Sequence, residues 1–142
     1  MPHGSKWVNF TKWTAMVVTI VASALASGDA VGQGPPAPTL RELVAGMPRG
    51  ERQEVRVLTA TIKPGDKTLF HTHRFPVTVY MLEGAFSLEM EGRPPVTIKA
   101  GQAMVEPPNV KMTGYNRSAT DTIRLVIFYV SDPETPFFDP VP

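Results

Sequence analysis

The stretch GDKTLFHTHRFPVTVYMLEG, residues 65–84, carries most of the information about the fold. It begins and ends with glycine, the residue most suited to tight turns. His71 and His73 are two residues apart, so on an extended backbone both imidazoles point to the same side, as two ligands of one metal ion must. The apolar run from Val77 to Leu82 then predicts a strand. The stretch therefore indicates a strand preceded by two histidines that share one face.

Short alternating or apolar runs continue on both sides of this stretch. Upstream lies EVRVLTATI, residues 54–62, in which Val55, Val57 and Thr59 share one face. Downstream, further runs lie at 85–90, 96–98, 103–105, 110–112 and 122–130. Turn-forming glycine, proline or asparagine residues separate these runs about every eight residues between 84 and 116. This rhythm predicts an all-β fold, a small antiparallel barrel or sandwich.

The composition agrees with one small β domain. The chain has 142 residues, 15 prolines and 11 glycines, which disfavours a helical bundle. It has no cysteine, which excludes disulfides, thiolate metal sites and a cysteine nucleophile. A formal net charge of +1 is not the basic excess that phosphate binding requires, so nucleic acid is not an expected partner.

The N-terminus has the order of a secretory signal peptide, predicted over residues 1–26. Lys6 and Lys12 precede the apolar run of residues 13–26, WTAMVVTIVASALA, which ends in the small-residue pair Ala24 and Ala26. A span across a membrane needs about 20 apolar residues, so this run is short for an anchor, the alternative interpretation. We expect a periplasmic or secreted protein that has no membrane attachment after removal of the leader.

Two segments flank the predicted barrel at 54–131. Residues 27–53 are rich in proline and glycine near their start, and the capping-box spacing of Thr39 and Glu42 predicts one short helix ending at Gly46. Residues 132–142 contain four prolines and cannot form a central strand. Phe137 and Phe138 are expected to hold this tail against the body or against a second subunit.

From Val55 to Val130 the chain resembles the cupin family of small β-barrels. The first motif of that family is a glycine, five residues, His-x-His, three or four residues, a glutamate, six residues and a glycine. The second is a glycine, five residues, proline, one residue, glycine, two residues, histidine, three residues and asparagine. The positions that match are Gly65, His71, His73 and Gly84 in the first motif, and Gly101, Pro107 and Asn116 in the second. The resemblance implies a cupin-type jelly roll, or double-stranded β-helix, that forms a homodimer.

The same resemblance implies a metal site, and here the chain departs from the pattern. Cupins typically hold a metal with three histidines and one glutamate, but the glutamate position is Val77, the third histidine position is Met112, and the second-motif glycine is Asn109. The two remaining ligands, His71 and His73, would hold one divalent metal ion weakly or none at all. Met112 could add a thioether sulfur, which would favour copper, although an inward methionine more often fills space.

The spacing also predicts what lines the interior. If Val77 occupies the inward glutamate position, residues two and four further along face inward with it, and the same rule applies around Met112. The predicted pocket-lining residues are Val77, Val79, Met81, Val110, Met112 and Asn116. Such an apolar pocket would keep the imidazoles neutral. Glu106 is the nearest carboxylate that could turn inward, but it precedes two prolines and is interpreted as a solvated turn residue.

These observations favour an exported single-domain cupin that binds a small apolar or aromatic molecule in its barrel, with a degenerate two-histidine metal site. A metal-dependent dioxygenase or isomerase is the first alternative, since many cupins are such enzymes. A structural or accessory cupin with a vestigial site is the second. The fold cannot choose among the three, because one barrel supports many chemistries.

Overall fold

The computed structural model describes residues 34–142, and the predicted signal peptide at 1–26 lies outside these residues. Nine strands are present in the described part. In chain order they are β1 (Glu54–Ile62), β2 (His71–Thr72), β3 (Val77–Glu83), β4 (Ala85–Met90), β5 (Val96–Lys99), β6 (Ala103–Glu106), β7 (Met112–Asn116), β8 (Ile123–Ser131) and β9 (Asp139–Pro140).

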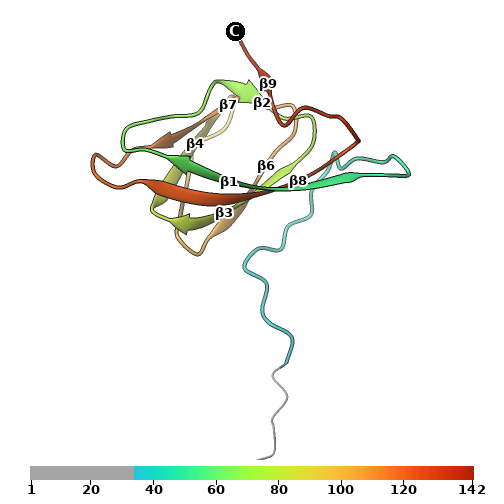
Figure 1. Cartoon of the computed structure of the whole chain (residues 1–142), viewed down its shortest axis with the longest axis horizontal. Helices are drawn as coiled ribbons and strands as arrows, with labels where there is room; N and C mark the ends of the chain where they lie inside the picture. The colour runs from blue at the N-terminus through green and yellow to red at the C-terminus, as the bar shows by residue number, and fades with distance from the viewer. Residues whose placement is uncertain (1–33) are drawn as a thin grey trace, which may run out of the picture. The chain divides into compact units, whose positions relative to one another are not determined.

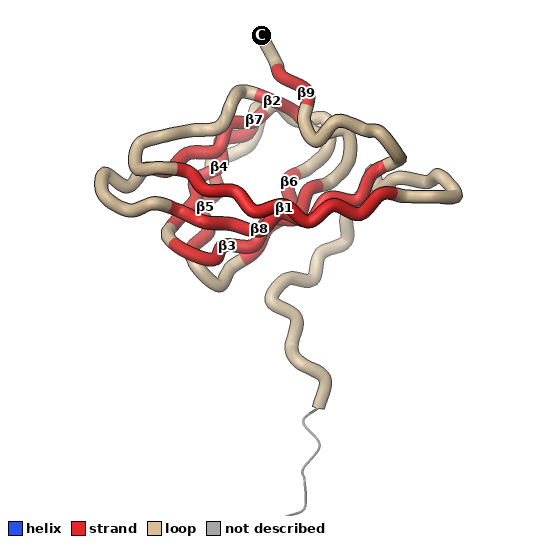
Figure 2. The backbone as a smooth tube through the Cα atoms, viewed as in Figure 1, coloured by secondary structure: helices blue, strands red, loops and turns tan. Residues whose placement is uncertain are grey.

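The strands form two antiparallel sheets that face each other (Figures 1 and 2). One sheet has the order β1-β8-β3-β6 and the other the order β5-β4-β7-β2-β9. Except for the β4–β5 hairpin, each strand lies in the opposite sheet from the strand before it. This crossing between sheets is the jelly-roll arrangement, and it confirms the all-β barrel that the sequence predicts.

The core lies between the two sheets. Val77, Val79 and Met81 alternate along β3 and are almost completely buried. Phe86 and Leu88 contribute from β4 in the opposite sheet. The period-two pattern in the sequence is therefore the physical reason that β3 presents one apolar face to the interior.

Gly84 allows the chain to pass from β3 directly into β4. Its φ is 77°, in the left-handed region that favours glycine. A Cβ at this position would lie 2.5 Å from Cγ2 of Ile123 on β8, closer than side chains can approach. The turn therefore needs glycine both for backbone conformation and for space.

Two predictions about local structure are wrong. Within residues 34–142 there is no helix, and Thr39–Gly46 is irregular. A helix this short needs tertiary packing, but the Leu43 side chain in its middle is fully exposed. The run predicted at 110–112 is instead the approach to β7, which begins at Met112 and continues through Gly114.

The C-terminal tail returns to the edge of the second sheet. β9 pairs with the short strand β2, with Thr72 opposite Asp139. Arg74 holds the carboxylate of Asp139 through two hydrogen bonds, at 2.8 and 2.9 Å. The tail thus lies beside the strand that carries the histidines. In residues 34–142 we find no helix with the length and apolar character needed to span a membrane.

Candidate functional site

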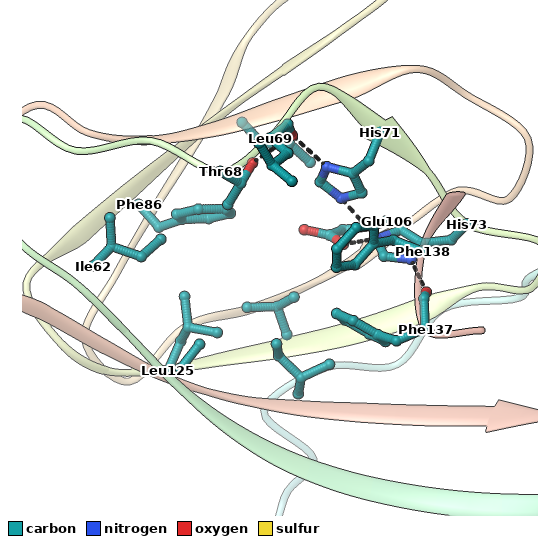
Figure 3. A pocket seen from close by; sticks show the side chains of 14 residues that line it. Ile62, Thr68, Leu69, His71, His73, Phe86, Glu106, Leu125, Phe137 and Phe138 are labelled. Atoms are coloured by element: carbon teal, nitrogen blue, oxygen red, sulfur yellow. Dashed lines mark hydrogen bonds and ion pairs between the residues drawn. The ribbon is translucent and has the colours of Figure 1, made fainter. Parts of the chain in front are cut away.

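A cavity of about 280 Å³ lies between the sheets, and both sheets and the C-terminal tail contribute to its walls. Figure 3 shows His71, His73 and Glu106 near the tail, with Phe86 and Leu125 farther along the cavity. Most of the lining is apolar: Ala60, Ile62, Leu69, Val79, Phe86, Leu88, Leu125, Ile127, Phe137 and Phe138, together with Thr68. The cavity is therefore an apolar chamber with a polar cluster at one end.

Both histidines are buried in this cluster, and each ring is held by a backbone carbonyl. Nδ1 of His71 donates to the carbonyl oxygen of Leu69, at 2.6 Å. Nδ1 of His73 donates to the carbonyl oxygen of Phe137, also at 2.6 Å. A carbonyl can only accept, so both Nδ1 atoms carry hydrogen, and in the neutral rings both Nε2 atoms present lone pairs.

Glu106 completes the cluster, and the prediction that it is a solvated turn residue is wrong. Its side chain is buried, and Oε2 lies 3.2 Å from Nε2 of His73. The strand β6 extends through Glu106, so the alternation that buries Met104 buries Glu106 as well. That spacing of two from an apolar residue is the sequence signal that could have identified it.

The three side chains place acceptor atoms close together in a dry environment. Nε2 of His71 lies 3.1 Å from Nε2 of His73, which in turn contacts Glu106. Burial lowers the pKa of His71 below its usual 6.5, against the raising effect of its hydrogen bond to Leu69. Burial therefore favours the neutral form of His71, whose Nε2 is directed at Nε2 of His73.

With both Nδ1 hydrogens bonded to carbonyls, the two Nε2 atoms and the Glu106 oxygen are disposed toward a metal ion or toward a hydrogen-bond donor of a ligand. Donor atoms bound to one metal at about 2.1 Å lie roughly 3.0–3.4 Å from each other, and both contacts of His73 fall in this range. Within residues 34–142, however, no group of three His, Cys, Asp or Glu side chains is arranged so that it could hold a metal ion as the side chains stand. The donor types suit a metal ion, whose binding would require the three side chains to close around it.

The structure places the predicted pocket residues in two environments. Val79 lines the cavity. Val77 and Met81 are fully buried in the core on the same strand, but they do not line the cavity surface. Val110 is half-buried and packs against the core from the loop before β7.

Met112 and Asn116 are also buried, and neither lines the cavity. Met112 lies opposite His71 in the β2–β7 pair. The amide of Asn116 is used locally, because it donates to the carbonyl oxygens of Ile62 and Asp121, at 3.0 and 2.7 Å. The matched asparagine of the second motif therefore holds a turn and does not contact the cavity.

The fold and the site together define a small jelly-roll barrel with an apolar interior and a buried His-His-Glu cluster. Residues 58–129 match the family model described as Cupin domain. The match covers just over half of the chain, which therefore belongs to the cupin family. No functionally curated protein matches the chain significantly.

Solved structures show the same fold at low sequence identity. A cupin-like protein from Thermotoga maritima is 19% identical, with a TM-score of 0.53, over 61% of this chain and 64% of that one. The DMSP lyase DddQ from Ruegeria pomeroyi is 21% identical, with a TM-score of 0.51, over 58% and 41%. The polyketide cyclase RemF from Streptomyces resistomycificus is 22% identical, with a TM-score of 0.50, over 61% and 60%. This chain spans less than two thirds of the length of each.

Proposed function

We propose that this chain is an exported cupin that binds a small apolar or aromatic molecule in its barrel. The observation that carries the proposal is the apolar cavity with its polar groups collected at one end. Ligand sites of this kind combine a largely apolar wall with a few polar groups that orient the ligand.

The size and polarity of the cavity restrict the ligand further. A cavity of about 150 Å³ lined by aliphatic and aromatic side chains binds benzene, so 280 Å³ suits a molecule somewhat larger than a single ring. Nε2 of His71 and the carboxylate of Glu106 are acceptors, so the ligand would present a hydroxyl or N–H group to them. A bicyclic or alkyl-substituted phenol has this chemistry.

A binding experiment with 2-naphthol and naphthalene tests the proposal. Metal-free protein should bind 2-naphthol saturably, and at least tenfold more tightly than naphthalene, because only the former can hydrogen-bond to the cluster. Ala60→Phe fills the cavity from β1 and should abolish binding. Thr61→Phe, on the exposed face of the same strand, is the matched control and should bind normally. Equal binding by both variants, or no binding by the wild type, would contradict the proposal.

Export is supported by the order of charge, apolar run and small residues within 1–26. Mass spectrometry of the mature protein should find its N-terminus between about Ser27 and Val31. Cytosolic protein that retains Met1 would contradict export and leave the cavity proposal unaffected.

A homodimer is proposed from the exposed outer face of the first sheet. Val55 and Val57 on β1 are 67% and 60% exposed, and Phe128 on the neighbouring strand β8 is 44% exposed. Apolar side chains gathered on one face commonly mark an interface. Sedimentation at micromolar concentration should show a dimer, and a monomer there would remove this part of the proposal.

A metal-dependent dioxygenase or isomerase is the second candidate function. It is supported by the contacts of His73 with His71 and Glu106, which bring three metal-compatible donors to the cavity.

A further inference from the structure

We propose that Glu106 is the third protein ligand of a divalent metal ion bound by His71 and His73. In this arrangement the carboxylate comes from β6. The family resemblance implies a glutamate on β3, the strand that follows the histidines, but this chain has Val77 there. The inference rests on the proposed function insofar as it concerns the same end of the same cavity.

The strand register explains why a carboxylate on β6 can take the place of one on β3. Val77 and Glu106 are direct partners in the antiparallel β3–β6 pair. Directly opposed residues project to the same face, with Cβ atoms about 4.5–5.5 Å apart. Both side chains are buried on the inner face of the sheet. A carboxylate at 106 therefore reaches nearly the same volume as a carboxylate at 77 would.

The hydrogen bonds around the histidines support metal ligation. Histidines that bind metals usually donate their second ring N–H to a carbonyl or carboxylate, which fixes the tautomer and the ring orientation. Here the carbonyls of Leu69 and Phe137 accept from the two Nδ1 atoms. Both Nε2 atoms are consequently free to coordinate, and they lie 3.1 Å apart.

The same geometry explains why Glu106 is buried. A carboxylate in an apolar cavity is costly unless it is paired with a cation. Its Oε2 atom lies 3.2 Å from Nε2 of His73, so a metal at the histidines would also neutralise Glu106. An ion-pair partner from Lys or Arg is not found for this carboxylate among residues 34–142.

The donor set also selects the class of metal. Two imidazoles and a carboxylate suit zinc, iron(II), cobalt(II) or manganese(II), whereas copper(I) prefers sulfur ligands. The sulfur of Met112 does not line the cavity. The structure therefore favours a divalent ion held by nitrogen and oxygen over the copper site that Met112 would complete.

Calorimetric titration with zinc and cobalt salts tests the assignment, with the visible spectrum of bound cobalt as a second measurement. Wild-type protein should bind one ion. Glu106→Gln, which keeps the size and removes the charge, should weaken binding at least tenfold. The exchange variant Val77→Glu with Glu106→Val should recover most of the lost affinity, because it returns the carboxylate to the opposing position. Glu91→Gln, an exposed carboxylate on the same protein, is the control and should bind as the wild type does.

The outcomes separate this proposal from its alternatives. Thermal unfolding of each metal-free variant establishes that it is folded. Wild-type protein that binds neither ion, or Glu106→Gln that binds both unchanged, would overturn the assignment. Loss of binding in Met112→Leu with no effect of Glu106→Gln would overturn it in favour of a sulfur ligand. Because 2-naphthol binding is measured on metal-free protein, failure of the metal proposal would be distinguishable from failure of the proposed function.

Discussion

Phe137→Ala should destabilise the protein because the ring of Phe137 joins the C-terminal tail to the histidine end of the barrel. The ring centroid lies 4.9 Å from that of His73 and 5.5 Å from that of Tyr129, which is fully buried. The substitution removes this packing but keeps the backbone carbonyl that accepts from Nδ1 of His73. The change therefore isolates the contribution of the ring from that of the hydrogen bond.

The expected loss follows from the burial of the side chain. Replacing a fully buried phenylalanine by alanine costs about 3–5 kcal/mol. Phe137 is only half-buried, so about 2 kcal/mol is expected. For a domain of this size, this corresponds to a decrease of roughly 8 °C in Tm. Because the ring lines the cavity, release of a bound ligand should also become faster.

Urea unfolding followed by circular dichroism measures the effect. Leu43→Ala is the control, since that side chain is fully exposed and its removal should change the free energy of unfolding by less than about 0.5 kcal/mol. A Phe137→Ala variant that unfolds within this margin of the wild type would show that the tail does not pack on the barrel, and would remove it as a cavity wall.

Two further predictions concern a turn and a surface ion pair. Gly84→Ala should destabilise the protein by about 2 kcal/mol more than Gly92→Ala, because both residues have positive φ but only Gly84 lies against Ile123. Equal losses of stability in chemical denaturation would argue against this packing. The hydrogen bonds from Arg74 lower the pKa of Asp139 below its usual 3.8, so the pair stabilises the fold above about pH 4 and loses that effect as the pH falls through the lowered pKa. Asp139→Asn should flatten this part of the stability curve measured by urea unfolding at low salt, and a curve identical to wild type would refute the assignment.

Local patterns in the sequence predicted most of the strands and the position of the histidines. Alternation along Val77, Val79 and Met81 correctly identified the buried face of β3, because a strand with one buried face requires apolar residues at every second position. The spacing of His71 and His73 likewise placed two imidazoles on one side of the backbone. These features depend only on residues that are close together in the chain.

Alternation alone did not determine which face of β1 is inward. Val55 and Val57 form its exposed face, whereas Arg56 lies on the inner side, where its guanidinium stacks on Tyr129 at 4.8 Å. Arg56 also donates to the carbonyl oxygen of Thr135 in the tail, at 2.7 Å. The tail provides partners for an arginine that would otherwise be costly to bury, and no local rule reveals a partner so distant in sequence.

The polar cluster was decided by tertiary structure for the same reason. The sequence determined that two histidines share a face. Glu106, however, contacts His73 only because β6 pairs with β3. The carbonyl of Phe137 likewise reaches His73 only because the tail returns to β2. Hydrogen bonds and charge pairing act over a few ångströms in space, and strand register brings together groups that are far apart along the chain. Local alternation therefore predicts the strands of the barrel, whereas long-range strand pairing assembles the polar cluster in its interior.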